Sequence, residues 1–304
     1  MSIQVQNISK AFGNIQALKD ISLEVNQGER FGLIGPDGAG KTTLFRILTT
    51  LLIADSGQAS IMGKDVVKDY KYIRNHVGYM PGRFSLYQDL TVEENLTFFA
   101  TVFGTTIREN YDLIKDIYEH IEPFKNRRAG ALSGGMKQKL ALSCALIHKP
   151  QVLFLDEPTT GVDPVSRKEF WEMLSRLQDK GITIFVSTAY MDEASLCDRV
   201  TLIQNGEILI TDKPESIAAS FPKTLFNIKT DLMYNLLQDL RSYEFQNSVF
   251  TFGEFVHYTD IRNTFNKDDL KKYLSHKKHN NIIIEEVQPT IEDRFMQLSQ
   301  SKLI

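Results

Sequence analysis

The chain has 304 residues, of which 42% are hydrophobic and 24% charged, the composition of an ordinary globular protein with about two domains. Its formal net charge of −3 leaves no basic excess, so we expect no nucleic acid partner. The N-terminus lacks the apolar core of a signal peptide, and the longest apolar-leaning stretch, residues 44–53, is about half of the ~20 residues that span a bilayer. Two cysteines are too few for a disulfide framework. Together these features predict a cytoplasmic chain.

The first 62 residues predict strands around one loop and one helix. Apolar and polar residues alternate in 3–5 and 21–25, as they do in half-buried strands. Residues 30–34 predict a short strand, and residues 41–52 an apolar-periodic helix.

A glycine-rich loop joins that strand to that helix. Residues 35–42 match G-x-x-x-x-G-K-[ST], the phosphate-binding P-loop, in the strand-to-helix context it requires. Glycines let backbone N–H groups turn toward phosphate, and the helix start adds partial positive charge. Lys41 is expected to reach the β- and γ-phosphates of a nucleoside triphosphate, and the Thr42 hydroxyl to ligate Mg²⁺. The nucleotide-binding residues expected here are Gly35, Pro36, Asp37, Gly38, Ala39, Gly40, Lys41, Thr42 and Thr43.

The stretch from about residue 90 to 149 predicts mainly helices. Thr91 and Glu94 form the sequence pattern of a capping box, in which each side chain satisfies a free backbone N–H at a helix start. Gly104 ends this helix, residues 107–121 predict the next, and Ser133 begins a third that runs to Pro150.

Strands and helices alternate again over residues 151–211. A buried strand, 151–155, ends in Asp156 and Glu157, and ligands of open α/β sheets bind at that edge. Asp156 can hold Mg²⁺ and Glu157 can polarise an attacking water. A helix at 165–178, a strand at 182–187 and a hairpin around Asn205-Gly206 follow.

The remainder of the chain predicts a second domain. After a short helix bracketed by Pro214 and Pro222, residues 223–300 predict strand, helix, two strands, helix, strand and helix. This order indicates a small α+β unit of ferredoxin-like type.

The motifs, in this order, resemble those of the ATP-binding cassette (ABC) ATPases, the nucleotide-binding subunits of ABC transporters. Residues 132–140, with Ser133, Gly134 and Gly135, are similar to the family's signature motif. Residues 156–164 are similar to its Walker B segment running into the D-loop, and Phe12 lies where the family places an aromatic that stacks on adenine. The resemblance implies an α/β P-loop NTPase of ABC type at residues 1–220, with a mixed core sheet, an antiparallel β subdomain and a helical subdomain at about 90–150. Residues 221–304 then form the small second domain.

The resemblance also implies a working assembly. Glu157 would be catalytic, Thr42 and Asp156 would hold Mg²⁺, and Phe12, Asp163 and the signature residues would contact ATP. The signature is a second anion site that would cap ATP held by another subunit, giving a homodimer or heterodimer. ATP hydrolysis would drive a separate transmembrane permease, which would hold the chain at the inner face of the cell membrane.

Two positions depart from the family's pattern. The Q-loop glutamine and the H-loop histidine are expected where this chain has Gly82 and Ala189. Asp37 replaces the usual asparagine of the P-loop, while Glu157 is kept. We therefore expect an impaired or rewired ATPase. A regulatory subunit paired with a complete cassette is an alternative, as is a soluble ABC ATPase not engaged in transport.

Residues 79–92, the segment 190–194 and the segment 284–295 resemble the bacterial export branch of the family. The transported molecule would then be a drug, lipid or glycan. Residues 83–90 are the expected docking groove for the permease.

Overall fold

The computed structural model describes residues 1–301, which divide into two compact units at Pro214/Glu215. The short helix α7 (Pro214–Ala219) begins at this division, and the predicted domain boundary after residue 220 lies just beyond it. None of the helices in the described residues is both long and apolar enough to cross a membrane.

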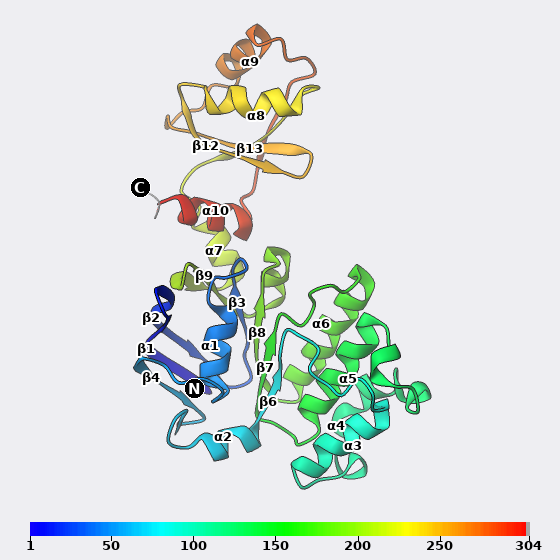
Figure 1. The fold of residues 1–304 in the computed structure, drawn as a ribbon. Helices are drawn as coiled ribbons and strands as arrows, with labels where there is room; N and C mark the ends of the chain where they lie inside the picture. The colour runs from blue at the N-terminus through cyan, green and yellow to red at the C-terminus, as the bar shows by residue number, and fades with distance from the viewer. Residues whose placement is uncertain (302–304) are drawn as a thin grey trace. The chain divides into compact units, whose positions relative to one another are not determined.

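The first unit is built on a six-stranded sheet with the order β10-β9-β3-β8-β7-β6 (Figure 1). Strands β9, β3, β8, β7 and β6 pair in parallel with their neighbours in this order, and β10 pairs antiparallel with β9. Every residue of β7 and β8 is buried, which explains their continuous apolar runs, because a parallel sheet is covered on both faces. The strands are β3 (Arg30–Ile34), β6 (Val77–Met80), β7 (Val152–Asp156), β8 (Thr183–Thr188), β9 (Arg199–Gln204) and β10 (Glu207–Asp212).

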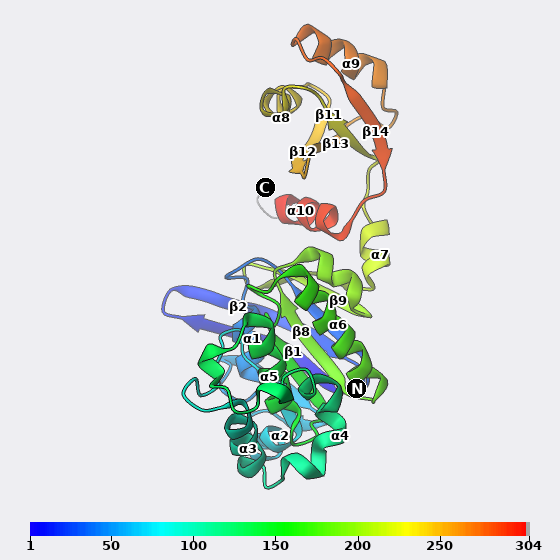
Figure 2. The same cartoon turned by 90° about the vertical axis from the view of Figure 1, so that its right-hand side faces the viewer.

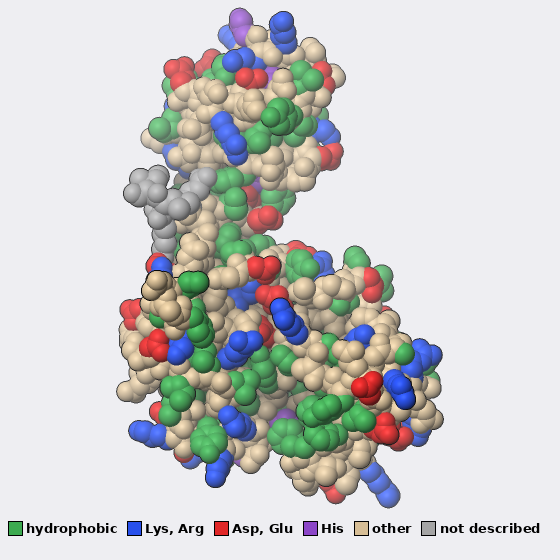
Figure 3. Space-filling view, viewed as in Figure 1, with side chains coloured by type: hydrophobic (Ala, Val, Ile, Leu, Met, Phe, Trp, Pro, Cys, Tyr) green, Lys and Arg blue, Asp and Glu red, His purple; other side chains and the backbone are tan. Residues whose placement is uncertain are grey.

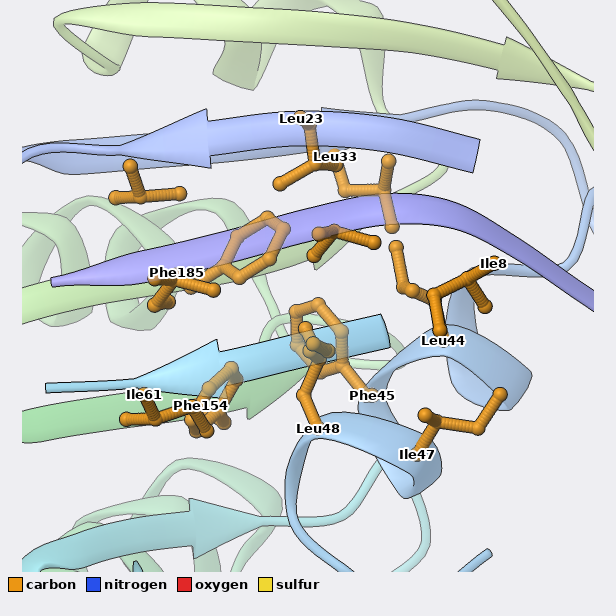
Figure 4. Close-up of a cluster of buried hydrophobic side chains, with 14 of the residues drawn as sticks. Ile8, Leu23, Leu33, Leu44, Phe45, Ile47, Leu48, Ile61, Phe154 and Phe185 are labelled. Carbon is orange, nitrogen blue, oxygen red and sulfur yellow. The ribbon is translucent and has the colours of Figure 1, made fainter. Parts of the chain in front are cut away.

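A second, antiparallel sheet has the order β2-β1-β4-β5, and helix α1 packs with both sheets. Phe45 of α1 lies against Phe154 and Phe185 of the larger sheet, with ring centroids 5.6 and 4.8 Å away (Figure 4). Burying each of these rings stabilises the fold by roughly 1.5–3 kcal/mol. This core holds the loop before α1 against the parallel sheet. The elements are β1 (Ile3–Phe12), β2 (Ile15–Val25), β4 (Ser56–Ile61), β5 (Lys64–Asp65) and α1 (Lys41–Leu48).

The middle of the first unit is mainly helical. The predicted capping box at Thr91 and Glu94 is present at the start of α3. Gly104, predicted to end that helix, has φ +68° just after it. The helices are α2 (Tyr70–His76), α3 (Val92–Val102), α4 (Ile107–Tyr118), α5 (Gly134–Leu146) and α6 (Pro164–Asp179).

Three predicted helix ends were wrong. The helix expected from Ser133 to Pro150 stops at Leu146, and Lys149 then takes φ +55°. The helix expected over 41–52 stops at Leu48, because Thr50 takes φ +63° and the chain turns back to hydrogen-bond the Arg46 carbonyl. The helix expected over 107–121 stops at Tyr118, and the chain then passes into a short 3₁₀ turn, Glu122–Phe124.

The second unit is an antiparallel sheet with the order β12-β13-β11-β14. Helices α8 and α9 cover one face and α10 lies on the other (Figure 2). This order and the βαββαβ succession confirm the ferredoxin-like prediction. The elements are β11 (Leu225–Lys229), α8 (Met233–Arg241), β12 (Gln246–Phe252), β13 (Phe255–Asp260), α9 (Lys267–His276), β14 (Ile283–Val287) and α10 (Ile291–Ser301).

Candidate functional site

The loop between β3 and α1 has a backbone shape that requires glycine. A Cβ on Gly35 would lie 2.2 Å from the Ile203 carbonyl oxygen. Gly40 has φ +104°, and a Cβ there would lie 2.5 Å from the Ala17 carbonyl oxygen. The loop is therefore wedged between β2 and β9, where it ends directly in the free N–H groups of the first turn of α1.

Lys41 is buried and is held at three points. Its ammonium donates to the carbonyls of Gly35 (2.7 Å) and Pro36 (3.0 Å), and it lies 3.1 Å from a carboxylate oxygen of Glu157. A buried ammonium is costly to leave unpaired, so these contacts stabilise it inside the loop. The loop lysine and the strand-end carboxylate, which were predicted separately as site residues, are thus in direct contact.

Asp156 and Glu157 end β7 beside the end of β8. The Ser187 hydroxyl donates to Asp156 Oδ1 over 2.6 Å, which fixes one oxygen of this buried carboxylate. The Glu157 N–H donates to the Ser187 carbonyl over 3.0 Å, and Glu157 takes φ +48°. This turn separates the two adjacent carboxylates, so that Asp156 contacts Ser187 and Glu157 contacts Lys41.

Two cavities, each of about 450 Å³, adjoin the loop and share Thr42 and Glu157. The first is lined by Ile15, Gln16, Ala17, Lys19, Gly38, Gly40, Lys41, Thr42, Thr43, Glu157 and Asn205. The second is lined by Thr42, Arg46, Tyr79, Pro81, Gly82, Arg83, Asp156 and Glu157. A hydroxyl and carboxylates facing one cavity are oxygen donors of the kind that suits Mg²⁺, which takes few protein ligands when phosphate supplies the others.

Tyr79 links the arginine and carboxylate sides of the second cavity. Burial, and next the negative charge of Asp156, raise the pKa of its phenol to about 12, while Arg46 acts in the opposite direction. The phenol therefore stays protonated at neutral pH and can donate a hydrogen bond.

Several predicted site residues lie apart from these cavities. Phe12 is half exposed at the end of β1 and pairs in register with Ile15, which does line the first cavity. Ser133 begins α5 and accepts the Met136 N–H, and neither it nor the next two glycines lines either cavity. Gly135 packs instead toward Ser166 of α6.

Asp163 acts as the N-terminal cap of α6. Its carboxylate accepts the N–H groups of Val165 (3.1 Å) and Ser166 (3.0 Å). Hydrogen bonding from Ser166 and Val165 holds the pKa of this exposed carboxyl below its ordinary value, so it is ionised at neutral pH.

A side chain at position 82 would crowd the end of β7. A Cβ at this position would lie 2.9 Å from the Asp156 carbonyl oxygen. Gln88 does not take its place, because it packs against Gly130 and does not line either cavity.

Ala189 follows β8, and the next side chain points elsewhere. The Tyr190 ring lies 5.1 Å from the Arg167 guanidinium of α6. Among the described residues, which include all six histidines, no histidine lines either cavity.

Helix α5 contacts both segments that flank the carboxylates. Lys137 lies 5.6 Å from the Phe84 ring, and the Gln138 side chain donates to the Pro158 carbonyl. Lys139 pairs with Glu169 of α6 over 2.9 Å. Lys137 and Gln138 thus join the start of α5 to residues beside the site, and Lys139 joins it to α6.

Sequence reasoning missed the residues that reach the cavities from other parts of the chain. Asn205 was assigned only to a hairpin turn, yet the Gly206 N–H donates to the Ala39 carbonyl and places that turn on the loop. Arg46 and Tyr79 had no motif that could have identified them. Arg83 had been placed in the expected docking segment.

Comparison with known proteins identifies the family. Residues 18–160 match the family described as ABC transporter. The chain is 42% identical over 219 residues to the probable multidrug ABC transporter ATP-binding protein YbhF of Escherichia coli K12, covering 71% of this chain and 38% of YbhF. It is 38% identical over 220 residues to the Nod factor export ATP-binding protein I of Rhizobium sp. N33, covering 71% of this chain and 72% of that protein. The chain belongs to the ABC transporter family.

The structure of this ABC cassette agrees with that assignment. It is similar to the dimeric ATP-binding cassette MJ0796 in a post-hydrolysis state with bound ADP and phosphate, with a TM-score of 0.63 and 26% identity. That match covers 69% of this chain and 98% of MJ0796. The chain spans 38% of the length of YbhF.

Proposed function

We propose that this ABC cassette binds and hydrolyses MgATP to energise a separate membrane subunit of an exporter. The observation that carries the proposal is the contact between Lys41 of the glycine-rich loop and Glu157 at the end of β7, beside a cavity of about 450 Å³.

Phosphate binding changes the partners of Lys41. Without nucleotide, its ammonium is shared by two loop carbonyls and Glu157. The β- and γ-phosphates of ATP carry more negative charge and replace these acceptors, supported by the loop N–H groups. Glu157 is then released from its ion pair, so its carboxylate becomes a free base when substrate is present.

Thr42 and Asp156 are the residues that would hold Mg²⁺. The Ser187 hydrogen bond occupies one Asp156 oxygen and leaves the other for the metal side of the cavity. The ion would supply charge neutralisation between the phosphates.

Hydrolysis requires one proton acceptor near the γ-phosphate. Glu157 accepts a proton from water as the water oxygen bonds to the γ-phosphorus. The bond from that phosphorus to the bridging oxygen breaks, and ADP leaves with the electron pair. Phosphate and ADP are the products, and the proton on Glu157 returns to solvent.

A second subunit would complete the site. The Ser133–Gly135 start of α5 is a positive helix pole that faces neither cavity of its own chain. We infer that it caps the γ-phosphate of ATP bound by a second cassette, related by twofold symmetry in a homodimer. The dimeric form of the similar cassette MJ0796 supports this arrangement.

An apolar groove supports docking of a membrane subunit. It has a volume of about 430 Å³ and is lined mainly by residues of α3, α5 and the segment 77–86, which overlaps the expected segment 83–90 only in part. Leu51 and Val102 at its rim are 58% and 62% exposed. Hydrophobic side chains gather here on the surface between α2 and α3 (Figure 3). Exposed apolar side chains along a groove favour a helix of the partner.

The base of this groove has one unsatisfied acceptor. His148 stacks on Phe103 with ring centroids 3.8 Å apart, and its Nε2 hydrogen-bonds the Val77 carbonyl. Burial lowers the pKa of the imidazole, so the ring is neutral and Nε2 carries the proton. Nδ1 is buried without a partner and can accept a hydrogen bond from the docked helix.

The groove is tested with two valines of similar exposure. Val102→Asp places a charge in the groove, whereas Val67→Asp places it at a valine that is 54% exposed and outside the groove. Co-purification with the co-expressed membrane subunit should be lost for Val102→Asp and kept for Val67→Asp. Equal recovery of both variants would contradict the docking proposal.

Nucleotide binding is tested separately by calorimetric titration with MgATP. Lys41→Ala should abolish the binding heat, because it removes the buried cation from the loop. Lys125→Ala, at an exposed ion pair with Glu93, should bind as the native chain does. Unchanged binding by Lys41→Ala would contradict the proposed site.

A regulatory nucleotide-binding role is the second candidate. Gly82 and Ala189 favour it, because neither offers a polar side chain to a γ-phosphate. The retained Glu157 and its contact with Lys41 favour the ATPase.

A further inference from the structure

The second cavity raises the question of which group faces the γ-phosphate. It is bounded on one side by Thr42, Asp156 and Glu157, the proposed metal and catalytic residues. Glutamine cannot be accommodated at position 82 without a shift of β7, and Ala189 has no polar side chain. A polar contact with the γ-phosphate is therefore left to the remaining residues that line this cavity.

Two arginines are among those lining residues. Arg46, one turn after Thr42 on α1, hydrogen-bonds the Tyr79 phenol. Arg83 follows Gly82, is exposed, and has no ion pair or hydrogen bond with any other described residue. It is thus an unpaired guanidinium beside two carboxylates and the phosphate-binding loop.

The backbone explains why Arg83 is at this position. Gly82 lies close to the Asp156 carbonyl, and the residue after it lines the cavity. Phe84 is held by the Lys137 contact with α5, which fixes the chain on the other side of Arg83.

We propose that Arg83 binds the γ-phosphate of ATP and supplies the polar contact that positions 82 and 189 lack. The inference rests on the proposed function, since it requires ATP at the loop. A guanidinium presents a planar set of donors that matches phosphate oxygens and remains charged at all physiological pH values. It also stabilises the charge that spreads over the γ-phosphoryl oxygens during transfer.

The proposal predicts discrimination between nucleotides. Arg83 would contact the γ-phosphate, so its loss affects a triphosphate and leaves a diphosphate unchanged. Equilibrium binding of MgADP and of the non-hydrolysable analogue MgAMP-PNP measures this ratio directly. Arg83→Ala should weaken analogue binding about 10- to 100-fold, as expected for a hydrogen bond to a charged group.

Two further variants serve as controls. Arg83→Lys keeps the charge without the planar fork and should give an intermediate loss. Arg108→Ala removes an exposed arginine of α4 that lines neither cavity and should bind both nucleotides normally.

Failure of this proposal and failure of the proposed function give different results. If Arg83→Ala weakens both nucleotides equally, or neither, Arg83 does not contact the γ-phosphate, and the proposed ATPase function is unaffected. If the native chain binds neither nucleotide, the proposed function is wrong, and the assignment of Arg83 is wrong with it.

Discussion

Replacing Gly40 by alanine should destabilise the ligand-free cassette more than replacing Gly38 does. Both glycines lie in the same loop with positive φ, +104° and +78°. A Cβ on Gly40 would lie 2.5 Å from the Ala17 carbonyl oxygen and 2.8 Å from Leu18, whereas a Cβ on Gly38 has nothing within 4 Å. The pair therefore separates backbone strain from close packing.

The magnitudes follow from these two terms. Strain in the left-handed region costs an L-residue about 1–2 kcal/mol, so Gly38→Ala should lower the free energy of unfolding by about that amount. Gly40→Ala combines strain of about 1–3 kcal/mol with a forced shift of packed atoms that costs about 1–3 kcal/mol more. We expect a total loss of about 2–6 kcal/mol for Gly40→Ala.

Urea unfolding followed by tryptophan fluorescence measures both losses. Trp171 is the single tryptophan, and it is 5% exposed on α6 of the first unit, so its emission reports unfolding of that unit. An unchanged slope with urea would show that the variants alter the free energy of unfolding alone. Equal losses for the two variants would refute the close approach of the loop to β2.

Three other changes have defined outcomes. Gly82→Gln should lower the rate of ATP turnover in a phosphate-release assay, because even its Cβ lies 2.9 Å from the Asp156 carbonyl oxygen; faster turnover would contradict this geometry. Thr91→Ala should lower the free energy of unfolding by about 1 kcal/mol, measured by urea unfolding, because it removes one half of the capping box. Burial alone would raise the pKa of Asp293, but hydrogen bonds from His257 and Thr290 hold that pKa below its ordinary value of 3.8. Asp293→Asn should therefore lower a calorimetric unfolding temperature at pH 7, where the carboxylate is ionised; the difference should shrink as the pH falls below about 3.8, and a difference independent of pH would contradict the pairing.

Local sequence patterns predicted the strands and loops that form the site. They did not predict that Asn205, Arg46 and Tyr79 line its cavities. Strand β3, its glycine-rich loop and the acids after β7 each follow from a short stretch of residues. Strand β6 (Val77–Met80) and helix α2 were not predicted, because both are short and carry no turn or capping signal that marks them.

Contacts between distant segments could not be predicted from the sequence. The fit of Gly82 against Asp156 depends on the parallel pairing of β6 with β7, which joins residues more than 70 positions apart. The end of α1 depends on Thr50 adopting a positive φ, a conformation set by the packing of the following turn rather than by helix propensity. In the second unit, the order of elements was sufficient, because a βαββαβ succession has few ways to cover one sheet.

The central claim is that this chain hydrolyses ATP through Glu157 without the usual glutamine and histidine. Release of phosphate from MgATP by the purified chain tests it most directly, with Lys41→Ala and Glu157→Gln measured beside the native protein. The account predicts turnover in the native chain that both substitutions abolish. ATP binding with no turnover would contradict the claim, and would instead indicate a regulatory subunit or a site that another cassette or the membrane subunit completes.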